Sequence, residues 1–355
     1  MYADQFEIYH GNANPELARK IARWLGSDVG RLEVFQFANE NIFVKILDNV
    51  REKDVFLIQP TNHPVNQSIM ELLIMIDAFK RASAGRITAV VPYYAYGRSD
   101  KKDQPRVPIT ARLIADMITV AGADRVLTMD LHQGQIQGFF NIPVDELTAV
   151  HILSRYFIDK RLDDVVVVTD LGFAKRARQF AELLEAPLAI IEKRRHGNLD
   201  RAEVMNVIGE VRGRRAIIVD DEIDTAGTLI EIVRALEREG VDRIYACATH
   251  GVLSDPATDR LRRSSVKEVV VTDSVPIPAA KRIPQLKVLS VAPLVGEAIK
   301  RIHRGESVGA LFSSEVSFTQ EMLLWEDGPD AEGHGPGPDD QEPPRVALVG
   351  AERDR

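Results

Sequence analysis

Cysteine is almost absent from this chain of 355 residues, which has a single one, Cys247. One cysteine excludes an internal disulfide and a metal site built from cysteines. No apolar run approaches the roughly 18 residues that a membrane-spanning helix needs. The first residues, MYADQFEIYHGNANPELA, lack the basic and then apolar pattern of a signal peptide. We therefore expect a cytoplasmic protein that does not enter membranes.

A basic surface is missing as well. The composition, with 28% charged and 45% hydrophobic residues, is that of a globular protein, and the formal net charge is −8. Nine acidic and three basic residues fall between Glu326 and Arg355, in a segment rich in glycine and proline. Such a segment cannot bury enough apolar surface to offset its ordering entropy, so we expect residues 326–355 to be a disordered acidic tail. Because no basic stripe with interleaved aromatic residues is found, nucleic acid is not an expected partner.

Short apolar runs alternate with amphipathic stretches along the rest of the chain. Strands are expected at 54–59, 87–94, 125–131, 165–170, 188–193, 216–221, 243–250 and 268–273. Helices are expected at 66–82, 107–122, 175–185 and 229–240. Nearly continuous apolar strands that alternate with helices are typical of parallel sheets covered on both faces. The predicted fold class is therefore α/β, with mainly parallel sheets flanked by helices.

The chain length suits two domains, and an internal likeness favours a duplication. DVFLIQ, a loop, a long helix and AGRITAVV resemble AIIVDD, a loop, a helix and VDRIYACA. We interpret this as two copies of one α/β domain, at 1–146 and 147–315. A chance likeness between two strand–helix–strand units is the alternative. Parallel sheets bind ligands at the carboxyl ends of their strands, so residues that follow the expected strands are the candidates for a site.

The stretch IIVDDEIDTAGTL, residues 217–229, places clustered acids where a strand is expected to end. Asp220 and Asp221 follow the apolar run, and a turn at 224–228 leads into a helix expected from Leu229. A helix N-terminus has unsatisfied N–H groups that suit a phosphate, whereas the acids suit ribose hydroxyls or Mg²⁺. An ordinary helix cap beside solvated acids is the alternative, but capping explains only one acid or hydroxyl.

This stretch resembles the ribose-phosphate loop of the type I phosphoribosyltransferase fold. The chain also resembles the ribose-phosphate pyrophosphokinase family over residues 7–313, in segments such as RVPITARLIAD, AGADRVLTMDLHQGQIQGFF and LSVAPLVGEAIKRIH. The resemblance implies two tandem phosphoribosyltransferase-like domains. It implies transfer of diphosphate from ATP to the C1 hydroxyl of ribose 5-phosphate, which gives phosphoribosyl pyrophosphate and AMP. A Mg²⁺ cofactor and a homo-oligomer, a hexamer in the family, are also implied.

The resemblance gives roles to the residues at matching positions. The ribose 5-phosphate residues are the clustered acids and the turn, namely Asp220, Asp221, Asp224, Thr225, Ala226, Gly227 and Thr228. The metal residues are His132 and Asp170, and the catalytic cations are Lys193 and Arg195. The ATP residues are Phe37, Asn39, Asn41, Arg98 and Ser99. Taken alone, His132 is more often a hydrogen-bonded loop residue, the cations a solvated run, and Phe37 equally a core residue.

Several residues on the expected ATP side differ from the family pattern. Ser99 stands where glutamine is common, Asn39 and Asn41 where aspartate and glutamate are usual, and Phe173 where a small residue is usual. These differences keep open a second function, a weakly active or non-catalytic paralogue that regulates synthase oligomers. A base phosphoribosyltransferase would share residues 217–229, but the duplicated first half and the cationic run KRR have no place in such an enzyme.

Overall fold

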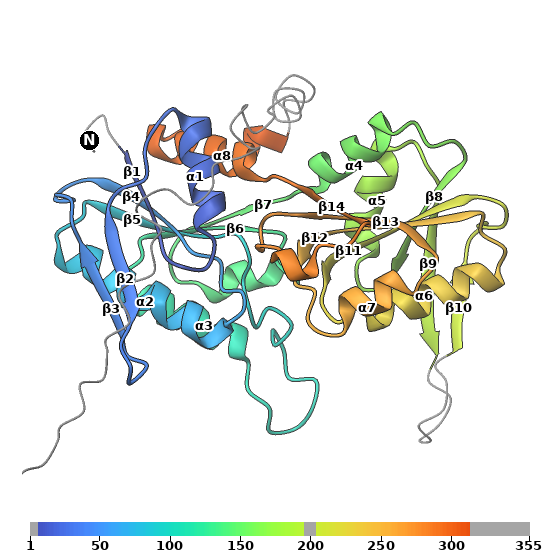
Figure 1. Cartoon of the computed structure of the whole chain (residues 1–355), viewed down its shortest axis with the longest axis horizontal. Coiled ribbons are helices and arrows are strands. Elements are labelled where there is room, and N and C mark those ends of the chain that lie inside the picture. The colour runs from blue at the N-terminus through green and yellow to red at the C-terminus, as the bar shows by residue number, and fades with distance from the viewer. Residues whose placement is uncertain (1–5, 195–203, 313–355) are drawn as a thin grey trace, which may run out of the picture.

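The computed structural model describes residues 6–194 and 204–312, which form two sheets side by side along the long axis of the molecule (Figure 1). The first sheet has five parallel strands in the order β1-β4-β5-β6-β7. They are β1 (Phe6–His10), β4 (Asp54–Ile58), β5 (Arg86–Val91), β6 (Arg125–Met129) and β7 (Val144–Leu147). An antiparallel hairpin of β2 (Leu32–Gln36) and β3 (Ile42–Ile46) forms a separate small sheet.

The second sheet has seven strands in the order β10-β9-β8-β11-β12-β13-β14. They are β8 (Val165–Asp170), β9 (Leu188–Arg194), β10 (Val204–Ile208), β11 (Arg215–Ile223), β12 (Arg243–Gly251), β13 (Val266–Thr272) and β14 (Leu286–Leu289). β10 runs antiparallel to β9, and the other neighbours in this sheet are parallel.

Helices connect the strands and cover the sheets. They are α1 (Pro15–Leu25), α2 (Val65–Arg81), α3 (Thr110–Ala121), α4 (Val150–Asp159), α5 (Ala174–Leu183), α6 (Gly227–Arg238), α7 (Ala257–Arg262) and α8 (Ala292–Arg304). Short 3₁₀ turns lie at Gly134–Phe139, Ala279–Lys281 and Gly309–Phe312.

Burial on both faces explains why the central strands are apolar without a break. Successive side chains of a strand point to opposite faces of the sheet. In β4, Val55 and Leu57 pack in one cluster with α2 and α3, whereas Phe56 and Ile58 pack in another with α1 and α8. A strand covered by helices on both sides therefore has no position at which a polar side chain would reach water.

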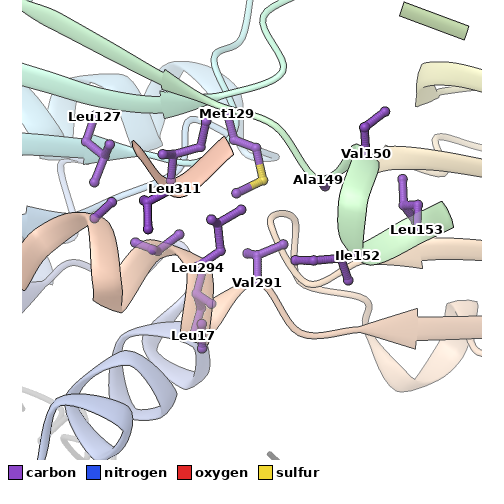
Figure 2. Packing of buried hydrophobic residues seen from close by; sticks show 14 of the residues in the cluster. Leu17, Leu127, Met129, Ala149, Val150, Ile152, Leu153, Val291, Leu294 and Leu311 are labelled. Carbon is purple, nitrogen blue, oxygen red and sulfur yellow. The ribbon is translucent and has the colours of Figure 1, made fainter. Parts of the chain in front are cut away.

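The last helix, α8, packs back onto the first sheet beside α1 (Figure 1). Gly296 allows this close approach, because a Cβ atom there would lie 2.5 Å from the ring of Trp24. Nδ1 of His303 lies 2.7 Å from Oδ2 of Asp54, at the start of β4. Leu294 belongs to one continuous apolar cluster with residues of α1, β6 and α4 (Figure 2). The two halves of the chain thus share a core, which holds one sheet against the other.

The predicted α/β class with parallel sheets flanked by helices is confirmed, and each expected element is found within a few residues of its expected bounds. Two expectations at the 217–229 stretch are wrong. β11 continues to Ile223 instead of ending at Asp221, because the backbones of Asp220 and Glu222 still pair with β12. α6 begins at Gly227 and not at Leu229, because Ala226 adopts a left-handed conformation (φ 57°) that turns the chain directly into the helix. No helix within the described ranges combines the length and apolarity that crossing a bilayer requires.

Candidate active site

A switch in strand order opens a gap between β8 and β11 near their carboxyl ends. The two strands pair in parallel as far as Val168 and Ile218. From β8 the chain passes through α5 to β9 on one side, and from β11 it passes through α6 to β12 on the other. Open α/β sheets bind their ligands at such a switch point. A cavity of about 460 Å³ lies here.

The cavity brings together expected residues from both halves of the chain. The expected site residues in its wall are Arg98, His132, Asp170, Asp220, Asp221, Asp224, Thr225, Ala226, Gly227 and Thr228. Its wall also contains polar residues for which the sequence suggested no role, namely Lys101, Gln133 and Glu222. The first half thus contributes a histidine and cations, and the second half contributes the acids and the turn.

The turn at 224–228 leads into the first turn of α6, as a phosphate site requires. Unsatisfied N–H groups and the helix dipole give this end of a helix a partial positive charge. A Cβ at Gly227 would meet its nearest atom at 3.5 Å, so the structure does not need glycine here for its own packing. Nη1 of Arg260, in α7, donates a hydrogen bond of 2.8 Å to the carbonyl oxygen of Thr225. α7 therefore braces the turn from outside the cavity.

The neighbouring acids of β11 differ in how readily they ionise. Burial, followed by the negative charge of Asp221, raises the pKa of Asp220 well above its ordinary value. Burial opposes ionisation of Asp221 too, but hydrogen bonds, first that with His132, outweigh it and lower the pKa of Asp221. The pair therefore presents a charge on Asp221 more readily than on Asp220.

His132 lies in the segment that follows β6 and points at β11. Its Nδ1 lies 2.7 Å from Oδ2 of Asp221. This hydrogen bond raises the pKa of His132, although burial lowers it. On the preceding residue, the carbonyl oxygen of Leu131 accepts a hydrogen bond of 2.7 Å from Nη1 of Arg176. Both contacts cross from one half of the chain to the other, so the position of His132 depends on the junction between them.

A metal ion at this site would need ligands beyond the protein. Within residues 6–194 and 204–312, no group of three or more His, Cys, Asp and Glu side chains is arranged to hold one. Mg²⁺ commonly takes one or two protein groups and completes its coordination with phosphate oxygens and water. His132, whose Nδ1 is engaged by Asp221, and Asp170 belong to the same cavity wall, and their side chains fit such a shared site.

Arg98 reaches the cavity from the loop that follows β5. Its Nε lies 2.6 Å from Oε1 of Glu222, and its Nη1 lies 3.7 Å from Oδ2 of Asp224. A guanidinium offers its N–H groups in a planar fork that matches phosphate oxygens. Arg98 is therefore suited to an anionic ligand that lies between the two halves.

Comparison with known proteins identifies the family of this chain. The N-terminal domain of ribose phosphate pyrophosphokinase matches residues 6–122, and the phosphoribosyl synthetase-associated domain matches residues 199–313. A ribose-phosphate pyrophosphokinase of Caldanaerobacter subterraneus subsp. tengcongensis is 58% identical over 314 residues, which cover 88% of this chain and 99% of that protein. The chain belongs to the ribose-phosphate pyrophosphokinase family.

Further members of the ribose-phosphate pyrophosphokinase family agree with this assignment. The protein of that name from Clostridium acetobutylicum is 54% identical over 317 residues, covering 88% of this chain and 99% of that protein. The crystal structure of phosphoribosylpyrophosphate synthetase from Mycobacterium smegmatis superposes with a TM-score of 0.81 at 44% identity, covering 85% of this chain and all of that chain. The predicted family, its enzyme class and the fold are thereby confirmed.

The expected adenine-side residues of this pyrophosphokinase lie away from the cavity. Phe37 is 48% exposed in the β2–β3 hairpin and packs against the rings of Phe35 and Phe43, so the alternative of a core phenylalanine is wrong. Oδ1 of Asn39 accepts a hydrogen bond of 3.2 Å from the backbone N–H of Asn41 in the same hairpin. The hairpin lies at the far end of the first half from β11 and α6 (Figure 1). A single chain therefore does not bring these three residues to the phosphate turn.

The structure places the backbones of two other expected residues, Ser99 and Lys193. The backbone N–H of Ser99 donates 2.8 Å to the carbonyl oxygen of Tyr96, in the turn that carries Arg98. The backbone of Lys193 lies in β9, two residues beyond Ile191, which pairs with Asp170. Arg195 lies outside the described residues. Lys193 is thus on the strand next to the one that ends at the proposed metal residue.

The residues that sequence reasoning missed are those whose role depends on contacts between distant segments. Glu222 stands between the acids and the turn, so its position beside Asp221 was a usable signal. Arg260 is separated from Thr225 by a whole helix and a strand, and nothing in the local pattern around it indicates a contact with the turn. Arg176 follows Asp170 closely, but its contact with Leu131 depends on how the halves meet.

Proposed function

We propose that this chain transfers diphosphate from ATP to the C1 hydroxyl of ribose 5-phosphate and releases phosphoribosyl pyrophosphate and AMP. One observation supports this above the others. A helix N-terminal turn, a pair of acids, a histidine and an arginine from both halves of the chain line a single cavity. Such a cavity offers sites for a sugar phosphate and for a second, more highly charged phosphate compound.

The ribose phosphate is proposed to bind on β11 and α6. The backbone N–H groups of residues 224–228 and the hydroxyls of Thr225 and Thr228 would hold the 5-phosphate at the positive end of α6. Asp220 and Asp221 would accept hydrogen bonds from the ribose hydroxyls. This orientation would turn the C1 hydroxyl toward the side of the cavity that holds His132 and Arg98.

The nucleotide is proposed to bind from the side of the first half. Arg98 would contact ATP phosphates, and Mg²⁺ would be held by His132, Asp170 and phosphate oxygens. The bound ion would neutralise part of the charge on the triphosphate. Ser99, next to Arg98, is a further proposed ATP residue, and Phe37, Asn39 and Asn41 are the proposed adenine-side residues. Because the hairpin lies away from the cavity of its own chain, we propose that a second copy of the chain supplies it within a homo-oligomer. The family resemblance implies that this oligomer is a hexamer. We propose the cytoplasm as its location.

The reaction is proposed to proceed directly, without a covalent enzyme intermediate. The C1 hydroxyl oxygen attacks the β-phosphorus of ATP and loses its proton to solvent. The bond between the β-phosphorus and the oxygen that bridges to the α-phosphate breaks, and AMP departs with that oxygen. Phosphoryl transfer spreads negative charge over phosphate oxygens, so positioning and nearby cations supply most of the catalysis. Lys193 and Arg195 are the proposed cations for this charge.

A second candidate function is supported by the differences on the nucleotide side. Phe173 lines the cavity beside Asp170, at a position where the family pattern suggests a small residue. Asn39, Asn41 and Ser99 also differ from the family pattern. Together with Phe173, these differences favour a weakly active or non-catalytic paralogue that regulates synthase oligomers. The two candidates differ in whether the purified chain alone turns over.

AMP release is the deciding experiment. The purified chain with ATP and Mg²⁺ should release AMP when ribose 5-phosphate is present and not when it is omitted. Lys193→Ala should lower turnover by about two orders of magnitude or more, since it removes a charge that acts in the transition state, while ribose 5-phosphate binding changes little. Lys267→Ala, an exposed lysine of β13, is the matched control. Absence of a nucleoside monophosphate product with every nucleoside triphosphate would favour the regulatory paralogue. Equal loss of binding and turnover in Lys193→Ala would contradict the role of Lys193.

A further inference from the structure

Glu222 occupies the cavity wall between the ribose acids and the phosphate turn, and neither the family resemblance nor the reaction above gives it a role. Its side chain is 10% exposed, and both of its oxygens have partners from the other half of the chain. Oε1 lies 2.6 Å from Nε of Arg98, and Oε2 accepts a hydrogen bond of 3.4 Å from the hydroxyl of Tyr93. Tyr93 and Arg98 both belong to the loop that follows β5. Glu222 thus fastens this loop to β11.

The two members of the Arg98–Glu222 pair differ in burial, and therefore in what each would lose if the ion pair broke. The Arg98 side chain is 54% exposed, so it can find water or another anion without loss. Glu222 has no such freedom, because a carboxylate in a buried place that loses its partner becomes an uncompensated charge. The pair should therefore persist when a ligand enters. Nη1 of Arg98 forms an ion pair with Asp224 at 3.7 Å, which is longer than a hydrogen bond, so its N–H groups can still donate to phosphate oxygens.

The residue before Glu222 on the same strand, Asp221, also contacts a side chain from the other half of the chain. Asp221 holds Nδ1 of His132 at 2.7 Å, and Glu222, the next residue, holds Nε of Arg98 at 2.6 Å. Consecutive residues of β11 therefore anchor two nucleotide-side groups of the other half. β11 also contains Asp220 and Asp221, the proposed ribose residues, and leads into the turn at 224–228. The proposed ATP site and the proposed ribose 5-phosphate site are therefore connected through one strand.

We propose that Glu222 is a positioning residue that holds Arg98 by its Nε edge and thereby sets where ATP phosphates lie relative to the ribose on β11. This proposal rests on the proposed function. It assigns to Glu222 no contact with either substrate. A loss of about 1 Å in the placement of reacting groups can cost on the order of a hundredfold in rate, so an anchor of this kind has a measurable effect without touching the reacting atoms.

ATP binding without turnover is the direct test. Isothermal titration calorimetry would measure the affinity for ATP with Mg²⁺, and separately for ribose 5-phosphate, in the full-length chain. Glu222→Ala should weaken ATP binding about tenfold, as expected for one charge-assisted contact, and leave ribose 5-phosphate binding within about twofold. Glu222→Gln should lose less, because its amide oxygen still accepts from Nε of Arg98 and its amide nitrogen can donate to the hydroxyl of Tyr93. Asp77→Ala, which breaks a similar Arg–Asp hydrogen bond of 2.7 Å on the surface of α2, is the matched control and should bind both ligands normally.

A double-mutant cycle separates positioning from a general loss of structure. If Glu222 acts through Arg98, then Arg98→Ala combined with Glu222→Ala should bind ATP no more weakly than Arg98→Ala alone. Additive losses would overturn the proposal, as would tighter ATP binding by Glu222→Ala, which would mean that Glu222 competes with ATP for Arg98. Normal ATP binding by Glu222→Ala in a wild-type background that releases AMP would overturn this inference and leave the function intact. A wild-type chain that binds ATP as expected but releases no AMP would overturn the function and leave the anchor standing.

Discussion

Asp220 and Asp221 show how two adjacent carboxyl groups can differ in how readily they ionise. Both are removed from water, and the charge of Asp221 raises the cost of ionising Asp220. His132 breaks the symmetry, because its hydrogen bond to Oδ2 of Asp221 favours the charged form of that residue alone. Asp220 is left with the raised pKa. A ribose with neighbouring hydroxyls would then meet two carboxyl groups, of which Asp221 ionises more readily than Asp220.

The same contact predicts the titration of His132. In the metal-free chain its pKa should lie above the ordinary value of about 6.5, because Asp221 stabilises the imidazolium. A raised pKa in the folded state means that the pair stabilises the fold fully below the unfolded-state pKa, and that this contribution is lost as pH rises through the folded-state pKa. NMR titration of the histidine ring measures the value directly. Asp221→Asn should lower it, and a His132 that titrates below the ordinary value would contradict the hydrogen bond.

The residues that could be predicted at this site are those that follow strands in the sequence. Asp170 and Asp220 come after apolar runs, and parallel strands present their carboxyl ends at one edge, so their proximity follows from the pattern. Glu222 and Arg98 are different. Their contact depends on how two sheets with separate hydrogen-bond networks are held together by α8 and the shared core. No local sequence pattern indicates that the side chains of Glu222 and Arg98 lie close together.

At the scale of elements, the phosphate turn depends on two helices. α6 provides its partial positive charge, and α7 holds the turn through the hydrogen bond from Arg260 to the carbonyl oxygen of Thr225. A turn in which Ala226 has a positive φ is not the lowest-energy conformation of an L-residue. External support therefore helps to keep the N–H groups of the turn in place before the ligand arrives.

Removing the brace should weaken sugar phosphate binding selectively. Arg260→Ala should raise the KM for ribose 5-phosphate about fivefold, the equivalent of about 1 kcal/mol for one exposed hydrogen bond, with the KM for ATP unchanged. Steady-state kinetics with each substrate varied in turn would measure the split. Arg263→Ala, at the exposed end of the same helix, should behave as wild type. If both KM values rise together, α7 supports the cavity in general and not the turn.

Elements that the sequence predicted well are those buried on both faces. β4, β8, β11 and β12 are nearly continuous apolar runs, and burial is what such runs report. The β2–β3 hairpin was not predicted, because its strands are short and none of their residues is fully buried, so no continuous apolar run marks it. The start of α6 was placed two residues late because hydrophobic periodicity begins at Leu229, whereas the backbone turns at Ala226. Backbone conformation has no apolar signature.

For the whole molecule, the described part of the cavity wall carries more acidic than basic side chains. Its described wall contains five acids, Asp170, Asp220, Asp221, Glu222 and Asp224, and two bases, Arg98 and Lys101. Both proposed substrates are anionic, so a wall with this balance would repel them without further positive charge. Mg²⁺, Lys193 and Arg195 are the proposed sources. We propose that the two domains divide between residues 146 and 147. Wherever that boundary lies, residues of α8 pack in one apolar cluster with both parts of the chain.

The exposed hairpin leads to a prediction about the assembled protein. If the β2–β3 hairpin of one copy completes the cavity of another, two different inactive chains should repair each other. Lys193→Ala removes a catalytic cation, and Phe37→Ala/Asn39→Ala/Asn41→Ala removes the hairpin contacts. Co-expression in equal amounts should recover about a quarter of the wild-type rate of AMP release. In random assembly, about half of the sites have an intact Lys193, and about half of those receive an intact hairpin from a neighbouring chain.

Mixing Lys193→Ala with Arg195→Ala is the matched control for that recovery. Both changes fall in the same segment of the same chain, so random assembly yields no chain with both cations, and AMP release should stay at the level of the single variants. Mass spectrometry of the intact assemblies would establish that mixed oligomers form in both experiments. Mixed oligomers of the hairpin and Lys193 variants that remain inactive would mean that each chain uses its own hairpin. In that case Phe37 must approach the cavity through a rearrangement of the first half of the chain, since the hairpin lies at the far end of that half (Figure 1).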